Sequence, residues 1–449
     1  MSDDPDDVDV LVIGGGMAGL TAAVRGIRSG AKVLLVEAAE SVGGSARYAG
    51  YVWTAPDRQT MARVNPHGDE ALRNALVDGF DRAVEWIRSL GVECGGAVPV
   101  LGFGRGHQFD PPRYIDECRR VVRAEGELLT RTTTTSLHHE HGGVAGADLA
   151  LPGGQRRSVR AGATILATGG FQANTELVDR HVHPAASTVA LRSNPTSRGD
   201  GLRLARQAGA ATGHDGAGFY GHLVPAGVSL ADPADFVSLS LYYSEHALLF
   251  NLAGRRFADE TLGDHLTTMA LLRQPEARGL LVADARVHRE WITAQYVEGA
   301  PSTDKFALAQ KRTDRAGLAD SVDELALLPP EWGYDGAEIA RQIQACNDAA
   351  TRGEEPMPGR AYDNTPLTEG PYYVVEVRPA ITFPFYGVLI DEHSRVLDSA
   401  GRPIAGLFAA GADAGGLYYQ AYAGGIAPAI VQGLAAAERA AAERDPAAS

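Results

Sequence analysis

The chain has 449 residues, 45% of them apolar and 22% charged, a globular composition that excludes a fibrous or wholly disordered protein. Lys and Arg number 41 and Asp and Glu 56, so the net charge is −15, which argues against nucleic-acid binding because no basic stripe is present. No run of 18 apolar residues predicts a membrane span, and the acidic start does not resemble a signal peptide. Three scattered cysteines without a CxxC pair predict no zinc, haem or iron–sulfur centre and fit a reducing compartment, so we expect a cytoplasmic protein.

A nucleotide-binding motif opens the chain. An apolar run at 8–13 predicts a buried parallel strand and the spacing at 20–27 predicts a helix, with G-x-G-x-x-G between them. Gly14 makes the tight turn, Gly16 lets the backbone approach a pyrophosphate, and Gly19 lets helix and strand pack closely. The helix N-terminus presents N–H groups to the phosphates, so the motif predicts dinucleotide binding rather than a fortuitous glycine-rich turn.

The next segment favours FAD over NAD. A second strand at 32–36 ends at Glu37, whose carboxylate is placed to accept hydrogen bonds from a ribose 2′-OH. Gly43, Gly44 and Ser45 follow a few residues later, and such a turn can lie under a pyrophosphate and a ribityl chain. A NAD domain would normally continue with further βα units instead.

The nucleotide fold is predicted to be interrupted by an inserted domain. Strand-like runs at 163–167 and 406–411 are far apart in the chain, yet both look like strands that end at a cofactor, and Asp413 follows the second. The expected domains are a first part of an FAD-binding domain at 1–210, a capping or substrate domain at 211–364, and the second part of the FAD-binding domain at 365–449.

Further elements follow from composition and periodicity. The expected helices are 199–211, 262–272, 336–351 and 434–443, and a strand is expected at 239–251. The run at 138–141 (His-His-Glu-His) could suggest a metal site, but its alternating faces favour an exposed turn, and we predict no bound metal.

Six segments together resemble the flavoprotein family of soluble fumarate reductases and 3-ketosteroid dehydrogenases, almost from end to end. They are VIGGGMAGLTAA, GGSARYAG, ATILATGGFQAN, RGDGLRLARQAGA, LLFNLAGRRFADE and the closing GVLIDEHSRVLDSAGRPIAGLFAAGADAGG. The resemblance implies an α/β fold, with a Rossmann-like FAD-binding domain of the glutathione-reductase type and an inserted α+β capping domain. It does not specify the substrate.

The resemblance also implies where FAD binds. The N-terminus of the last helix would approach the flavin and stabilise negative charge on its reduced form. Members of the family with covalent flavin carry a His near the glycine turn, and since 45–47 (Ser-Ala-Arg) has none, we expect non-covalent FAD. The residues expected to contact FAD are Gly14, Gly16, Met17, Ala18, Gly19, Glu37, Ala38, Gly43, Gly44, Ser45, Thr134, Ala167, Thr168, Gly169, Gly411, Asp413, Gly425, Ile426 and Ala427.

Three positions separate the two branches of the family. Fumarate reductases have an Arg proton donor, a His and a second Arg in slots that correspond here to Asp264, Phe383 and Tyr422. All three cationic groups are replaced, which disfavours a dianion such as fumarate because a dianion needs charge-assisted partners. Similarity to the ketosteroid dehydrogenases instead implies that Tyr422 polarises a substrate ketone, while Asp264 stands where that branch has a Tyr.

The same similarity suggests an apolar pocket. Phe383, Phe385 and Tyr386 would line this pocket, and the segment 51–53 with Trp53 also resembles the steroid branch. The predicted substrate is therefore a cyclic ketone, steroid-like or otherwise apolar.

The predicted reaction introduces a C=C bond α,β to a ketone. Tyr422 and the backbone of the following glycines would donate hydrogen bonds to the carbonyl oxygen and acidify the α C–H. Asp264, or His265 beside it, would remove the α proton, and the β hydrogen would leave as a hydride to flavin N5. Electrons would then pass to a diffusible acceptor, a quinone, O₂ or a partner protein, because the sequence encodes no second redox centre.

Alternatives stay open at the sequence level. The same groups run in reverse would make a reductase of an activated alkene, and a third reading is an FAD-bound protein without catalysis. Asp264 could instead cap a helix that starts near His265. His222 is a candidate pocket residue. Tyr242 and Tyr243 occupy successive positions of an expected strand, so only one of them can face the pocket, and Tyr243 is favoured.

Overall fold

The computed structural model describes residues 6–295 and 302–444, which separate into two compact units. Unit 1 comprises residues up to 182, residues 194–218, and residues from 383 onward. Unit 2 comprises residues 183–193 and 219–382. The longer segment of unit 2 runs from 219 to 382, whereas the capping domain was expected at 211–364.

Unit 1 is built on a sheet whose core is parallel. Its strands run in the order β17 (Arg395–Leu397), β18 (Pro403–Ala409), β9 (Arg156–Leu166), β1 (Asp6–Ile13), β2 (Val33–Val36) and β6 (Glu127–Leu129). Strands β18, β9, β1, β2 and β6 are parallel neighbours, so their carboxyl ends share one edge. A hairpin of β7 (Thr133–Glu140) and β8 (Gly143–Ala150) extends the sheet from β9. Parallel sheets of this kind bind ligands at the edge formed by their carboxyl ends.

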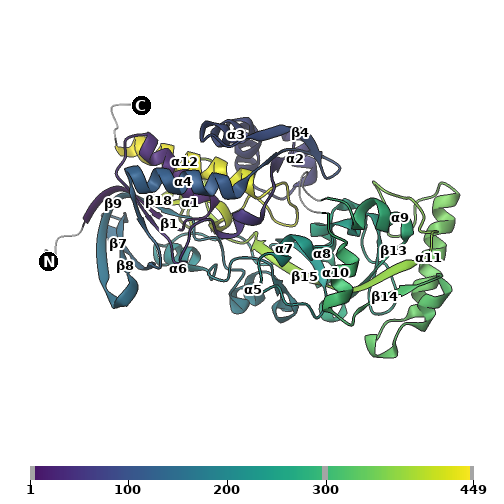
Figure 1. The fold of residues 1–449 in the computed structure, drawn as a ribbon. Helices are drawn as coiled ribbons and strands as arrows, with labels where there is room; N and C mark the ends of the chain where they lie inside the picture. Colours follow the sequence, from purple (N-terminus) through teal and green to yellow (C-terminus); the bar gives the residue numbers. More distant parts are fainter. Residues whose placement is uncertain (1–5, 296–301, 445–449) are drawn as a thin grey trace. The chain divides into compact units, whose positions relative to one another are not determined.

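Helices cover this sheet (Figure 1). Helix α1 (Met17–Arg28) packs between α4 (Pro111–Glu125) and the C-terminal α12 (Ile426–Arg444), which also contacts α3 (Glu70–Ser89). The α1–α12 contact is close because a Cβ at Gly433 would lie only 2.6 Å from the Ala18 carbonyl oxygen. The remaining elements of unit 1 are β3 (Tyr51–Thr54), α2 (Arg58–Val64), β4 (Cys94–Val100), β5 (Gly104–Phe109), α5 (Thr175–His181), α6 (Asp200–Gln207), β16 (Val388–Leu389) and β19 (Ala414–Gly415).

Unit 2 is a mixed sheet with surrounding helices. Its central strand β15 (Tyr372–Pro384) pairs with β10 (Ala190–Leu191), β11 (Phe219–Pro225), β13 (Gly279–Ala283) and β14 (Ala316–Ala319), and β12 (Leu248–Phe250) pairs with β13. The helices are α7 (Asp235–Ser238), α8 (Asp264–Leu272), α9 (Ala285–Val287), α10 (Lys305–Arg312) and α11 (Gly336–Thr351).

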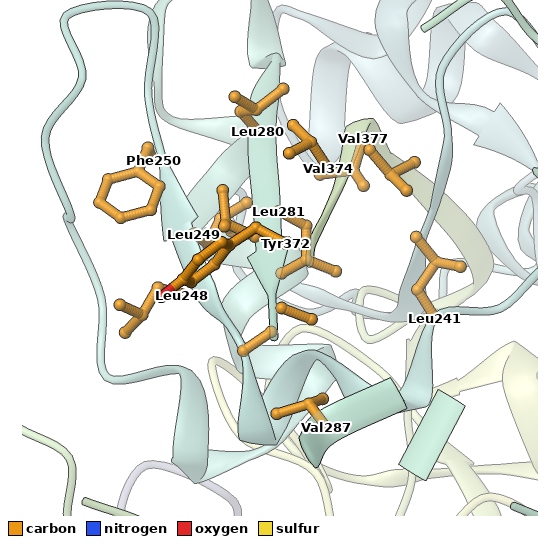
Figure 2. Close-up of a cluster of buried hydrophobic side chains, with 14 of the residues drawn as sticks. Leu241, Leu248, Leu249, Phe250, Leu280, Leu281, Val287, Tyr372, Val374 and Val377 are labelled. Carbon is orange, nitrogen blue, oxygen red and sulfur yellow. The ribbon is translucent and has the colours of Figure 1, made fainter. Parts of the chain in front are cut away.

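A hydrophobic core holds unit 2 together (Figure 2). Leu248, Leu249 and Phe250 of β12 face the same cluster as Leu280 and Leu281 of β13, and all five are almost fully buried. Burial of each such side chain stabilises the fold by about 1.5–3 kcal/mol before the entropy cost. This core gives the polar residues of the neighbouring loops a rigid support.

The α/β fold predicted from the sequence is confirmed, and one predicted element is wrong. The segment expected as a strand at 239–251 contains a 3-10 helix at Tyr242–His246, and only Leu248–Phe250 is extended. The apolar and aromatic residues there fit a buried helical turn as well as a strand, so periodicity could not separate the two. Among the described residues, no helix combines the length and hydrophobicity that crossing a membrane requires.

Candidate functional site

The glycine loop after β1 has the geometry that a pyrophosphate needs. A Cβ at Gly14 would lie 2.2 Å from the Ala167 carbonyl oxygen, and one at Gly19 would lie 1.8 Å from the Gly14 carbonyl oxygen, so neither position accepts a side chain. A Cβ at Gly16 would meet no atom within 4 Å, so the backbone there borders open space. Gly16 precedes α1 without a side-chain cap, which leaves first-turn N–H groups of Met17 and its neighbours for a phosphate.

The predicted ribose and flavin turns adjoin this loop. Glu37 is buried, and its two carboxylate oxygens accept hydrogen bonds from the Gly15 N–H and the Ala39 N–H, each 2.7 Å long. The Gly43 N–H donates to the Gly15 carbonyl oxygen over 2.7 Å, which brings the 43–45 turn onto the glycine loop. The structure therefore gathers three predicted FAD segments at the carboxyl ends of β1 and β2.

Asp413 holds two other predicted segments together. Its carboxylate accepts hydrogen bonds from the Thr168 N–H and hydroxyl and from the Gly170 N–H, which join the end of β9 to the segment after β18. Burial raises the pKa of Asp413, and these hydrogen bonds oppose the rise. Gly411 lies beside Ala18, since a Cβ added at Gly411 would be 3.0 Å from the Ala18 Cβ. The residues of unit 1 fit an extended FAD, and nothing in their donor set conflicts with it.

Tyr422 lies in an aromatic cluster at the start of α12. Its ring centroid is 5.4 Å from that of Trp53, 5.7 Å from Tyr418, 6.2 Å from Phe383 and 6.3 Å from Phe385. We call these five residues the aromatic cluster. Tyr386 was expected in the same pocket, but its hydroxyl forms hydrogen bonds with Arg206 and Thr212.

The Tyr422 hydroxyl is directed to the glycines that precede α12. A Cβ at Gly425 would lie 3.3 Å from the Tyr422 Oη, and one at Gly424 would lie 2.0 Å from the Trp53 carbonyl oxygen. The Tyr418 hydroxyl also donates to the Gly424 carbonyl oxygen over 2.8 Å, which fixes this turn. The Tyr422 phenol therefore lies beside the N-terminus of α12, which begins at Ile426 and Ala427.

In unit 2 the structure brings His222 and Asp264 together. The His222 Nδ1 lies 2.7 Å from the Asp264 Oδ2, and both residues are buried, with 2% and 5% exposure. Burial lowers the pKa of His222, so its neutral form prevails. Since a carboxylate can only accept, the geometry assigns the proton to Nδ1 and leaves a lone pair on Nε2. Nε2 is buried without a hydrogen-bond partner among the described residues.

The helix-capping alternative for Asp264 is wrong. Helix α8 starts at Asp264 itself and its N-cap is Gly263, so the Asp264 side chain does not stand at the capping position. His265 is also buried, and desolvation lowers its pKa to about 4. Sequence reasoning had placed Asp264 or His265 first and His222 behind them, because spacing alone cannot show which imidazole meets the carboxylate.

The structure separates the two neighbouring tyrosines. Tyr243 lies in the hydrophobic core of unit 2, whereas the Tyr242 ring meets His222 edge-on, with centroids 4.9 Å apart. The preference for Tyr243 rested on a strand that the structure replaces with a 3-10 helix, and it therefore chose the core-facing residue.

Two cations near Tyr242 were missed by the sequence analysis. Arg192 donates to the Tyr242 hydroxyl over 3.0 Å, and the Lys305 ammonium lies 5.0 Å from the centre of the Tyr242 ring. They come from segments separated by more than 100 residues, and neither stands in a recognised motif. No signal in a single sequence would have found them.

The rest of this polar region is close to neutral. Desolvation and the nearby Asp264 raise the pKa of Glu245 to about 8, so this carboxyl is largely protonated at pH 7. In the histidine run of β7, the His138 Nε2 lies 2.9 Å from the Asp148 Oδ1. No group of three His, Cys, Asp or Glu suited to a metal occurs within residues 6–295 and 302–444.

Comparison with known proteins agrees with this geometry. The description "FAD binding domain" fits residues 117–426, more than half of the chain, and "FAD dependent oxidoreductase" fits residues 9–170. The chain belongs to this FAD-binding family. The predicted family and the predicted FAD cofactor of this flavoprotein are thereby confirmed.

Relatives of the flavoprotein include reductases. It is 27% identical over 470 residues to the "Fumarate reductase (cytochrome)" of Shewanella frigidimarina, which spans 97% of this chain and 77% of the relative. It is 26% identical over 461 residues to the "Vinyl phenol reductase" of Lactiplantibacillus plantarum, spanning 93% of this chain and 92% of the relative. The flavoprotein is an FAD-dependent oxidoreductase of the fumarate reductase family.

A solved structure shares the fold over the whole chain. The 3-ketosteroid-Δ4-(5α)-dehydrogenase of Rhodococcus jostii RHA1, in complex with 4-androstene-3,17-dione, superposes with a TM-score of 0.78 at 19% identity. The match covers 98% of both chains. At this identity the likeness concerns the fold alone.

Proposed function

We propose that the flavoprotein introduces a C=C bond α,β to a ketone of a cyclic substrate. The observation that carries this proposal is the Tyr422 hydroxyl beside Gly425 and the N-terminus of α12, inside a cluster of aromatic rings. Donors placed in such an apolar setting stabilise an enolate-like oxygen more strongly than they would in water. The fold is compatible with this choice, since a ketosteroid dehydrogenase shares it.

Proton transfer is assigned to His222. Its Nε2 lone pair accepts the α proton, and Asp264 holds the ring in the required tautomer and stabilises the imidazolium that results. Bound FAD supplies the two-electron acceptor, which takes the β hydrogen as a hydride. The α C–H and β C–H bonds break, the C=C bond forms, and the electron pair leaves later to a diffusible acceptor. Asp264 is thus a positioning residue in this proposal rather than the base.

The reverse reaction is a second candidate. Reduction of an activated alkene would use the same groups, with protonated His222 as the proton donor, and the reductases among the relatives favour this direction. Non-covalent attachment of FAD stays a prediction, as does a diffusible electron acceptor.

An anaerobic absorbance titration tests the proposal. Saturated cyclic ketones, 3-ketosteroids among them, are expected to bleach the flavin band of the oxidised protein. The variant Tyr422→Phe should slow bleaching by about 100-fold if its hydroxyl stabilises the oxyanion. The matched control is Tyr334→Phe, which removes another buried tyrosine hydroxyl. Failure of every ketone, with reoxidation of the reduced protein by enones, would replace the dehydrogenase with the reductase.

A further inference from the structure

Among the described residues of unit 2, two buried cations have neutral hydrogen-bond partners and no carboxylate partner. Arg192 has 6% exposure and Lys305 has 5%. Arg192 donates to the Phe236 carbonyl oxygen and to the hydroxyls of Ser240, Thr382 and Tyr242, over 2.7–3.1 Å. Lys305 donates to the carbonyl oxygens of Val237 and Ser238, over 2.7 and 3.5 Å. No carboxylate of the described residues forms an ion pair with either cation.

Two other buried arginines of unit 2 do have a carboxylate partner. Arg256 and Arg360 both have 5% exposure, and both bond to the carboxylate of Glu260, over 2.6 and 3.2 Å. Burying a charge without a partner costs several kcal/mol or more, so such pairing is the rule in protein interiors. The absence of a carboxylate at Arg192 and Lys305 therefore sets these two residues apart.

The two cations lie close enough to repel each other. Desolvation, and then the charge of Arg192, lowers the pKa of Lys305 to about 8, and Asp264 opposes the shift. Both are bonded to the last turn of the short helix α7 and both contact Tyr242. They are thus fixed in position at one place in the fold.

The charges around Tyr242 do not balance. Arg192 and Lys305 contribute two positive charges and Asp264 one negative charge. Glu245, with its pKa raised to about 8, is largely neutral at pH 7, and His222 and His265 are neutral because burial lowers their pKa values. The cluster therefore carries a surplus of about one positive charge, which matches a monoanion. The His222 ring meets the Tyr242 ring edge-on, and its Nε2 has no hydrogen-bond partner among the described residues, so it is available to a ligand.

We propose that Arg192 and Lys305 form a subsite for a carboxylate of the substrate, with Tyr242 aligning the two cations. This inference rests on the proposed function, because it identifies the substrate of that reaction as a keto acid rather than a neutral ketone. A carboxylate accepts two parallel hydrogen bonds from a guanidinium and one from an ammonium, which suits this pair of residues. Asp264, Phe383 and Tyr422 stand here where the reductases have cationic residues, and Arg192 and Lys305 supply positive charge instead.

The test compares matched acids and neutral analogues. The holoprotein would be titrated by calorimetry with 4-oxocyclohexanecarboxylate and its methyl ester, and with cinnamate and cinnamamide. The acid of at least one pair should bind about tenfold tighter or better than its neutral partner, as expected for charge-assisted hydrogen bonds. Lys305→Met and Arg192→Met should remove this preference, whereas Lys305→Arg should keep it.

A control variant guards against general damage. Arg378 is a half-buried arginine of unit 2 that, among the described residues, donates to a backbone carbonyl, that of Val228, over 2.6 Å and pairs with no carboxylate. Arg378→Met should leave the preference for acids intact. Tyr242→Phe keeps both cations and serves as a milder variant if the methionine substitutions do not fold.

The outcomes separate this inference from the proposed function. Acid preference that depends on Lys305, without bleaching of the flavin by any ketone, supports the subsite and defeats the dehydrogenase. Equal binding or oxidation of acids and esters, or no binding of any acid, overturns the subsite even if ketones bleach the flavin.

Discussion

At the scale of single residues, the His222–Asp264 pair separates a group that moves a proton from one that orients it. Asp264 supports the charged form of His222 both by its charge and by its hydrogen bond. Asp264→Asn removes the charge, so the pKa of His222 should fall further below its usual range. The unprotonated base then persists to lower pH.

The different roles of His222 and Asp264 give the first prediction. In Asp264→Asn, kcat/KM for flavin reduction should drop by roughly 100-fold or more, because Nδ1 loses its carboxylate and the wrong tautomer becomes accessible. The acidic limb of its pH profile should also move to lower pH. His222→Gln should instead lose the limb altogether. Stopped-flow flavin absorbance between pH 5 and 9 measures both, and an unmoved limb in Asp264→Asn would remove His222 from the reaction.

A second residue-scale prediction concerns Lys305. Its pKa is lowered to about 8, so the ammonium that binds a carboxylate is present below pH 8 and is lost above it. Affinity for a bound acid should therefore fall as the pH rises through 8. Glu245 titrates in the same range and becomes negative, which acts in the same direction.

Two variants separate these contributions. Lys305→Arg should bind acids without a decline near pH 8, since an arginine keeps its charge there. Glu245→Gln should retain the part of the decline that belongs to Lys305. Calorimetric titrations at pH 7 and pH 9 decide the matter, and a decline that survives Lys305→Arg would assign it to Glu245.

At the scale of elements, two glycines of the loop between β1 and α1 differ in the space available for a side chain. Gly14 has φ +108° and no room for a Cβ, whereas Gly16 has a conventional φ and borders open space. Gly16→Ala should therefore fold normally but weaken FAD binding by roughly tenfold or more, because the methyl group meets the pyrophosphate. Gly14→Ala should lower stability as well.

The control for this prediction is Gly96→Ala, at another glycine of unit 1 whose added Cβ meets nothing within 4 Å. Flavin fluorescence would report the affinity for FAD, and circular dichroism would report the fold. Unchanged FAD affinity in Gly16→Ala would mean that the phosphates do not lie over this residue.

The same elements show why sequence reasoning succeeded in part. The β1–α1 loop, Glu37 and the 43–45 turn are local patterns in which backbone conformation demands particular residues, and they were predictable. The segment at 239–251 was not, since apolar residues fit a buried 3-10 turn as well as a strand. Arg192 and Lys305 meet only through tertiary structure, so no local pattern marks them.

At the scale of the whole molecule, the buried carboxyl of Glu245 makes stability depend on pH. Its pKa rises from 4.5 to about 8 because burial and Asp264 disfavour its charge, while a hydrogen bond from the Asp264 backbone N–H opposes this. Between these two values the folded chain keeps a proton that the unfolded chain releases. The free energy of unfolding therefore loses this contribution as the pH rises from about 4.5 to 8.

The side chain introduced by Glu245→Gln is neutral at every pH, so the free energy of unfolding of this variant should not fall in this way as the pH rises. Relative to the wild type, its free energy of unfolding should increase between pH 5 and pH 8, by at least about 1 kcal/mol given about 1.4 kcal/mol per unit of pKa shift and some solvent screening. Urea unfolding at both pH values measures the difference, and comparison with the wild type cancels the opposing contribution of His265, whose pKa is lowered to about 4. Glu93→Gln, at an exposed position of unit 1, is the control and should follow the wild type. A constant difference between Glu245→Gln and the wild type would show that Glu245 is ionised in the folded protein, and the charge surplus at Arg192 and Lys305 would then disappear with it.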